Sequence, residues 1–419
     1  MPWDGDGVEV AARIAAERYH AVGVDLESAV EALLRVPVSL QCWQGDDVIG
    51  FENRPGTMGG GLAVTGSYPG RARSADELRA DLGLALSLLP GRHRVNLHAS
   101  YGEFGGQRVD RDAIEPGHFE GWMQWACSRG VGLDFNPTYF AHPLAASGFT
   151  LAHPDASVRS FWIEHGRRAR RVGSAFADAT GTGSVVNVWV PDGYKDQPAD
   201  RRAPRERLAS AMDEVFREPM AGVVDAVEGK LFGIGVESYT AGSHEFYLGY
   251  ATTRRKWWCL DAGHFHPTES VADKVSAALM FVPGVLVHAS RGVRWDSDHV
   301  VAMDDALIEL AREAARAEPG RVRWATDFFD ASIDRVAAWV VGARNVQKAI
   351  LMALLEPPGV TEAEASGDLT RRLVLQQEAR GLPWGAAWDM ACRRADVPRD
   401  GEWLRVVEDN RRRVRSGRA

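Results

Sequence analysis

The clearest evidence for the fold is the stretch KWWCLDAGHFHPTESVADKVSAALMFVPGVLVHASR, residues 256–291. It opens with an apolar run typical of a buried strand, at 256–263, and closes with a second such run, at 284–291. The pattern between them, at 269–281, is helical. Two strands joined by a helix form a β-α-β unit, and repeated units of this kind build a parallel sheet.

The same alternation continues along the chain. Six further strands are predicted at 38–43, 94–101, 130–137, 184–191, 226–235 and 321–329, which makes eight. Further helical patterns lie at 74–90, 116–130, 155–176, 203–216, 304–318 and, after the last strand, 331–357. Eight units over roughly 330 residues favour a closed (β/α)8 TIM barrel in the α/β class. A doubly wound open sheet is disfavoured because no glycine-rich dinucleotide-binding turn follows the first strand.

Helical segments are expected on both sides of the barrel. We predict an N-terminal helical segment at 1–37 and the catalytic barrel at 38–357. Residues 358–419 are predicted to form a charged helical extension with a role in oligomerisation.

Composition narrows the class of protein. Of the 419 residues, 45% are apolar and 25% are charged, as in a globular enzyme. The net charge of −8 disfavours a nucleic-acid partner held by bulk attraction to phosphate. The four cysteines are widely spaced and indicate neither a zinc ribbon nor a disulfide framework. The N-terminus does not resemble a secretory signal, and the longest apolar stretch, 275–289, is too short to span a bilayer. We therefore expect a cytoplasmic protein without a membrane partner.

Polar and aromatic side chains interrupt or follow the predicted strands near their carboxyl ends. They are His98, Asp134, Asn136, Trp189, Glu228, Lys230, Asp261, His264, His288, Asp296, Asp298, Asp327 and Phe328. In a TIM barrel this end of the sheet forms the active-site face, so these side chains are expected to lie together. Taken singly, each has a structural interpretation: a hydrogen-bonded histidine, a core aromatic ring, a solvated aspartate, or a buried ion pair between Glu228 and Lys230.

Spacing and number favour a metal site. Glu228 and Lys230 are two residues apart, so in a strand they point to the same side. Asp296 and Asp298 can converge on one point, where two carboxylates repel unless a proton or a cation lies between them. Acidic residues and histidines gathered on one rim predict a divalent metal site, with two ions expected. The mixed imidazole and carboxylate ligands suit Mn2+, Zn2+, Co2+ or Mg2+.

Several long blocks closely resemble bacterial L-rhamnose isomerases. They are VSLQCWQGDDVIGFEN (38–53), TGSYPGRARSADELRADL (65–82), VEGKLFGIGVESYT (227–240), CLDAGHFHPTE (259–269), RWDSDHV (294–300), DFFDASIDRVAAWVVGARN (327–345) and LPWGAAW (382–388). The resemblance runs from about residue 8 into the C-terminal extension. It implies a manganese-dependent aldose–ketose isomerase, assembled as a homotetramer. Such an enzyme interconverts L-rhamnose and L-rhamnulose, the first step of rhamnose catabolism.

The resemblance also implies roles for individual residues. The ligands of a structural ion would be Glu228, Asp261, His288 and Asp327. The ligands of a catalytic ion would be His264, Asp296 and Asp298, and either Asp261 or Glu228 would be the ligand shared between the two ions. Lys230 would face the sugar O1, and His98 and Trp189 would line the sugar site. The chain departs from the family at the residues before Lys230 and Asp327 and in HASYGEFGG (98–106), but no expected ligand is replaced.

Isomerising a 2-hydroxy aldehyde requires hydrogen to move from C2 to C1. Divalent cations at O1 and O2 polarise the carbonyl, and Lys230 can stabilise the charge that grows on O1. An apolar rim that includes Trp189 and Phe328 would exclude water. Because every rim carboxylate is assigned as a ligand, Asp327 included, none remains to act as a base, which favours a hydride shift.

Two other classes of protein compete with this interpretation. A metal-dependent phosphoesterase or endonuclease on the same barrel would use similar ligands, because fold does not fix function. It should carry a basic face, and none is centred on the strand-end loops. A sugar-binding protein without catalysis gives no reason for Asp296 and Asp298 to lie so close together.

Overall fold

The structure, a computed structural model, describes residues 5–52, 66–231, 238–293 and 299–418. Two of the predicted site residues, Asp296 and Asp298, lie outside these ranges.

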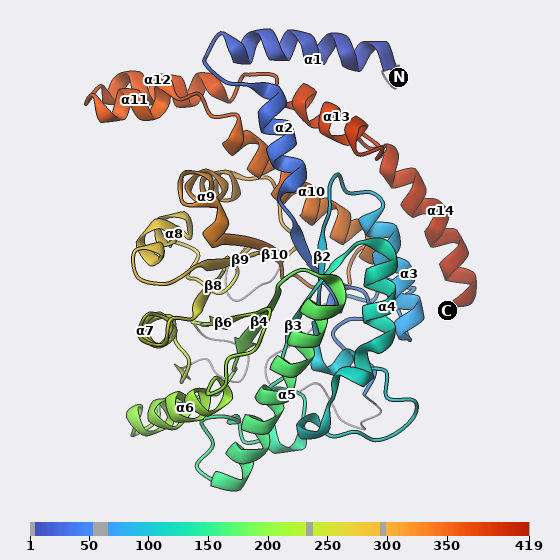
Figure 1. The fold of residues 1–419 in the computed structure, drawn as a ribbon, viewed down its shortest axis with the longest axis vertical. Coiled ribbons are helices and arrows are strands. Elements are labelled where there is room, and N and C mark those ends of the chain that lie inside the picture. The colour runs from blue at the N-terminus through green and yellow to red at the C-terminus, as the bar shows by residue number, and fades with distance from the viewer. Residues whose placement is uncertain (1–4, 53–65, 232–237, 294–298, 419) are drawn as a thin grey trace.

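Eight parallel strands close into a barrel (Figure 1). In spatial order they are β1 (Val38–Gln41), β10 (Val322–Thr326), β9 (Val285–Ala289), β8 (Trp257–Asp261), β6 (Val223–Glu228), β4 (Ser184–Trp189), β3 (Gly132–Asn136) and β2 (Arg94–His98). Each strand pairs with its neighbours in parallel register. The predicted TIM barrel is therefore confirmed.

The helices that follow the strands lie around the barrel. They are α3 (Ala75–Leu86), α4 (Glu120–Arg129), α5 (Ala156–Thr180), α6 (Arg202–Val215), α7 (His244–Arg254), α8 (Ala272–Leu279), α9 (Asp305–Arg316) and α10 (Arg335–Leu354). Of these, α7 was not predicted from the sequence. Its residues include Gly249 and two consecutive threonines, which have low helix propensity and weaken the helical pattern.

The fifth barrel strand begins and ends earlier than the sequence indicates. It was predicted at 226–235, but β6 spans Val223–Glu228. The charged residue Asp225 interrupts the apolar run, so the sequence pattern did not indicate that the strand begins at Val223. In the structure this carboxylate is paired with Arg170 at 2.8 Å and Lys256 at 2.7 Å. Lys230 therefore follows the strand and does not belong to it.

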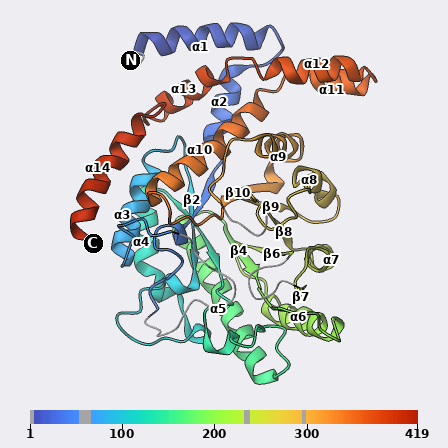
Figure 2. The same cartoon turned by 180° about the vertical axis from the view of Figure 1, so that it is seen from behind.

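Within the described residues, six α-helices lie before and after the barrel. They are α1 (Gly5–His20), α2 (Leu26–Arg35), α11 (Gly359–Ala365), α12 (Leu369–Ala379), α13 (Trp384–Arg394) and α14 (Glu402–Gly417). Both views show α1 and α11–α13 on one side of the barrel, outside α2, α9 and α10, with α14 running down beside α3 (Figures 1 and 2). An ion pair between Arg418 and Asp81 fastens the end of α14 to α3. No helix in the described ranges is long and apolar enough to cross a membrane.

A short antiparallel ribbon joins two loops at the carboxyl end of the barrel. It consists of β5 (Gly193–Tyr194), which follows β4, and β7 (Tyr239–Thr240), which precedes α7. Next to it, the backbone N–H of Lys230 donates to the carbonyl oxygen of Gly242 at 3.3 Å. The ribbon thus helps to position the segment that carries Lys230.

Candidate metal centre

Four buried or half-buried side chains meet at the carboxyl end of the barrel. Glu228, Asp261, His288 and Asp327 come from β6, β8, β9 and the residue after β10. One ligand atom from each lies within 4.8 Å of the others. Nδ1 of His288 lies 3.0 Å from a carboxylate oxygen of Asp327, and 3.5 Å from oxygens of Glu228 and of Asp261. This set of one nitrogen and three carboxylate donors fits a divalent cation.

The electrostatics of this cluster favour a positive charge inside it. Burial raises the pKa of the Glu228 carboxyl, but His288 and His264 outweigh burial, so the net pKa lies below its ordinary value. Burial lowers the pKa of His288, but Cys259, Glu228 and Asp327 outweigh it and the net pKa is raised. Burial raises the pKa of Asp327. Three carboxylates brought this close are costly unless a cation or proton lies among them.

The hydrogen bonds of Asp261 leave one of its oxygens directed at the cluster. Oδ1 accepts from the backbone N–H of Gly263 at 2.6 Å and from Oγ of Ser290 at 2.7 Å. Oδ2 accepts no hydrogen bond from the described part of the chain, although Asp261 is only 1% exposed. A buried carboxylate oxygen left without a donor, 3.5 Å from His288, is suited to a metal ion.

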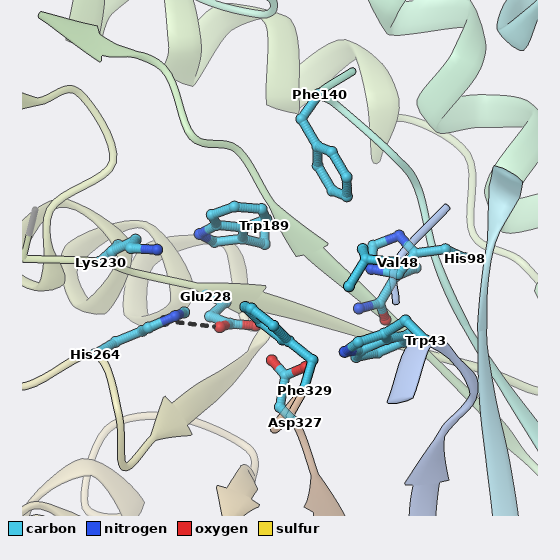
Figure 3. Close-up of a pocket in the computed structure, with 11 residues that line it drawn as sticks. Trp43, Val48, His98, Phe140, Trp189, Glu228, Lys230, His264, Asp327 and Phe329 are labelled. Atoms are coloured by element: carbon cyan, nitrogen blue, oxygen red, sulfur yellow. Dashed lines mark ion pairs between the residues drawn. The ribbon is translucent and has the colours of Figure 1, made fainter. Parts of the chain in front are cut away.

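Glu228 also faces a second histidine, which comes from the loop after β8. Nδ1 of His264 lies 3.0 Å from Oε1 of Glu228 (Figure 3). The other oxygen, Oε2, lies 3.5 Å from Nδ1 of His288. The loop is held from outside, because Nε2 of His244 contacts the carbonyl oxygen of His264 at 3.0 Å. The two oxygens of Glu228 therefore face two separate imidazoles.

A cavity opens above this centre (Figure 3). Its lining is mostly aromatic and polar: Trp43, Val48, His98, Asn136, Phe140, Trp189, Glu228, Lys230, His264, Asp327 and Phe329. Nζ of Lys230 lies 5.1 Å from the centre of the Trp189 ring, which is nearly parallel to the His264 ring. Burial lowers the pKa of His98 to about 3, with a further contribution from Arg111, so this imidazole is neutral. The cavity combines the apolar walls and few convergent polar groups of a small-molecule site.

Two of the side chains singled out in the sequence lie elsewhere. The ring of Phe328 is fully buried in the hydrophobic core, where it packs on Gly342 of α10, and the neighbouring Phe329 lines the cavity. Beyond the end of β10, the alternation of side chains along a strand no longer determines which way each side chain points. The sequence therefore could not show which of the two phenylalanines lines the cavity. Asp134 lies deeper in the barrel and pairs with Arg94 near the opposite end, whereas Asn136 reaches the cavity.

Four lining residues were missed in the sequence: Trp43, Val48, Phe140 and Phe329. Val48 has a left-handed backbone with φ 59°, which is rare for a β-branched residue and leaves no signal in the sequence. The side chain of Asp46 holds this turn, accepting from the N–H of Gly50 at 2.7 Å and the hydroxyl of Tyr101 at 2.6 Å.

Comparisons with known proteins indicate the family of the chain. The family model described as "RhaA: L-rhamnose isomerase (RhaA)" matches residues 7–418. An L-rhamnose isomerase of Rhodopirellula baltica is 56% identical over 416 residues, which cover 98% of this chain and 97% of that protein. An L-rhamnose isomerase of Citrobacter koseri is 55% identical over 416 residues, 98% of this chain and 99% of that protein. A third, of Salmonella gallinarum, has the same identity and coverage.

Proposed function

From the premise that the chain belongs to the L-rhamnose isomerase family and is an aldose–ketose isomerase, we propose how it works. It interconverts L-rhamnose and L-rhamnulose, as the first step of rhamnose catabolism, by a hydride shift from C2 to C1. The observation that carries this proposal is the four-residue cluster on the floor of an aromatic cavity that also holds a buried lysine. Because the chain belongs to the L-rhamnose isomerase family, the alternative of a phosphoesterase or endonuclease is set aside.

Two Mn2+ ions are the proposed cofactors, with Co2+, Mg2+ and Zn2+ as chemically acceptable substitutes. Glu228, Asp261, His288 and Asp327 would hold one ion. His264 would hold the other together with Asp296 and Asp298, and Glu228 is placed to serve both because each of its oxygens faces a different histidine. When bound, such ions polarise the neighbouring O1 and O2 of an open-chain sugar.

The protein's own side chains position the substrate and protect it from water. The ammonium group of Lys230 stabilises negative charge that grows on O1, and its 5% exposure strengthens this interaction. His98, neutral and buried, presents a hydrogen-bonding edge to a sugar hydroxyl. Trp189, Trp43 and Phe329 form apolar walls against which a sugar face or its methyl group packs.

The lack of a metal-free carboxylate among the described lining residues supports the hydride route. Among the described residues that line the cavity, the only carboxylates are those of Glu228 and Asp327, and both belong to the metal cluster. An enediol route would need a carboxylate above C2 that is free of metal. The lining also includes Asn136, whose amide cannot take up a proton.

Isomerisation in D₂O tests this route. A hydride never exchanges with solvent, so the ketose should carry essentially no deuterium at C1 after a single pass. Deuterium at C1 that appears together with the product would contradict the hydride shift and would identify Glu228 or Asp327 as a base. A panel of aldoses assayed with each divalent ion tests the substrate and the cofactor in parallel.

A cytoplasmic homotetramer is the proposed form of the enzyme, with the helices outside 38–357 contributing to assembly. Exposed apolar side chains on two of these helices support this proposal. On α12, Leu369, Leu373 and Val374 are each more than half exposed, and on α1, Ile14 is 50% exposed. Leu373→Asp should weaken assembly, which light scattering would detect as a smaller mass. An unchanged mass would place the interface elsewhere.

A further inference from the structure

A thiol lies beneath the metal centre, and none of the roles assigned above uses it. Cys259 is on β8, two residues before Asp261, so both side chains point into the barrel and the thiol is one layer deeper. Cys259 is 1% exposed. The other members of its layer are small or apolar: Val185, Ala226, Leu286 and Ala325. The thiol is therefore surrounded by hydrocarbon on its lower side and by metal-binding groups above.

This thiol is close to two side chains of the metal cluster. In the sheet register Cys259 is the direct partner of Glu228 on β6. Sγ of Cys259, a carboxylate oxygen of Glu228 and a ring nitrogen of His288 all lie within 4.8 Å of one another. His288 is completely buried, and its Nε2 has no hydrogen-bond partner in the described part of the chain. These three side chains form a donor set that differs from the oxygen-rich cluster above but shares two members with it.

We propose that Cys259, Glu228 and His288 form a site for a thiophilic divalent ion such as Cd2+. Occupation of this site would exclude an ion from the cluster of Glu228, Asp261, His288 and Asp327. Sulfur is a soft ligand and prefers such ions, whereas Mn2+ and Mg2+ prefer oxygen. The inference rests on the proposed metal-dependent function only in that Glu228 and His288 serve both sites.

Charge and proton balance are satisfied at this site. As the sulfur–metal bond forms, the S–H bond breaks and the thiol proton leaves to solvent, and the His288 nitrogen that binds the ion must likewise carry no proton. The resulting thiolate and the Glu228 carboxylate together neutralise the two charges of the ion. A neutral complex suits a layer lined by Ala226 and Ala325, where an uncompensated charge would be costly.

Cadmium absorption tests the proposal without any turnover. Cys127 is exposed and would bind cadmium by itself, so the parent for this experiment carries Cys127→Ser. Metal-free parent is titrated with Cd2+ while the ultraviolet thiolate-to-cadmium absorption band is recorded. We expect a band that saturates at one ion per chain. Cys259→Ser should lose it, and Cys392→Ser, which removes a buried thiol of α13, should keep it.

Competition tests the sharing of ligands. Because Glu228 and His288 serve both ions, added Mn2+ should raise the apparent Kd for Cd2+ in proportion to its concentration. A band that persists in Cys259→Ser, that is absent from the parent, or that ignores Mn2+ overturns the proposal. If Cys259→Ser does not fold, Cys259→Ala, which matches Ala226 and Ala325 in the same layer, takes its place. A parent that isomerises rhamnose but lacks the band overturns the thiophilic site alone.

Discussion

The two ends of the barrel both bury carboxylates, but they neutralise them differently. At the amino end, Asp134 accepts four hydrogen bonds: two from Arg94 at 2.9 Å, one from Ser39 at 2.7 Å and one from the N–H of Val185 at 2.7 Å. Burial raises its pKa, but Arg94 outweighs burial and the net pKa is below its ordinary value. Every oxygen of this carboxylate has a donor from the protein.

At the carboxyl end, the carboxylates accept fewer hydrogen bonds from the protein and lie close to one another and to His288. Asp261 keeps one oxygen without a hydrogen bond in the described part of the chain, and His288 lies beside three acidic groups. Without a cation, a cluster of this kind contributes little to the free energy of folding. The contrast distinguishes a carboxylate that supports the fold from one that serves a reaction, and each prediction below tests it.

The largest effect is expected at the carboxyl end. Asp327→Asn keeps the size of the side chain but removes one negative charge from the metal cluster. Since metal activation is worth several kcal/mol, we expect kcat/KM to fall about 1000-fold. Asp330→Asn is the matched control, because the Asp330 carboxylate bonds to Ser332 and does not line the cavity. Equal activities for the two variants, assayed for ketose with Mn2+, would remove Asp327 from the site.

The largest effect on stability is expected at the amino end. Arg94→Met leaves Asp134 buried without its cation, and breaking such a pair costs about 3–5 kcal/mol. Ser39→Ala removes only one of the four donors and should cost about 1 kcal/mol. Denaturant unfolding measures both. The folded Arg94→Met protein should keep its kcat, and a loss of kcat in step with stability would mean that the two ends are not separable.

The sequence predicted the barrel, but it did not predict at which end of the barrel each inward-facing side chain lies. Apolar runs with helical patterns between them indicated the barrel, and the alternation of side chains along a strand placed Glu228 in its interior. Asp261 and His288 were expected at the carboxyl ends of their strands, where they lie. Alternation gives the direction of a side chain but not its depth. Asp134 and Asn136 point the same way, yet only Asn136 reaches the cavity.

For side chains that lie beyond the ends of the regular strands, the sequence did not predict which way they point. Phe328 and Phe329 follow β10, and their directions depend on how the chain turns toward α10. Val48 depends on a left-handed turn that Asp46 stabilises from within the core. Such positions are fixed by contacts between distant segments, so no periodicity in the local sequence reveals them.

Metal removal should affect the two ends unequally. An ion present at about 100 times its Kd stabilises the folded state by about 2.7 kcal/mol. We expect a chelator to lower the Tm of the parent and of Arg94→Met by the same amount. In Asp327→Asn the chelator should have little effect. Thermal unfolding with and without Mn2+ measures this, and a Tm of Asp327→Asn that still rises with Mn2+ would show that the remaining ligands suffice.

The smallest effect concerns a buried histidine at the amino end. His93 precedes β2, accepts from the N–H of Val38 at 3.3 Å and is 5% exposed. Burial lowers the pKa of His93 to about 4, from an ordinary value of about 6.5. Between these two values the unfolded chain binds a proton that the folded chain does not. Stability therefore rises with pH across this window and is lost as pH falls through it.

The contribution of His93 is limited to one proton, or at most about 1.4 kcal/mol per pH unit. In His93→Gln this slope should be absent, so the free energy of unfolding of the parent minus that of the variant should fall as pH drops from about 6.5 to about 4. Since His93 is remote from the metal cluster, the difference should be the same with Mn2+ and with a chelator. The other buried histidines titrate equally in both proteins and cancel. A pH slope that survives in His93→Gln, or a difference that changes with metal, would mean that the amino end responds to the metal centre, and the distinction between the two ends would fail.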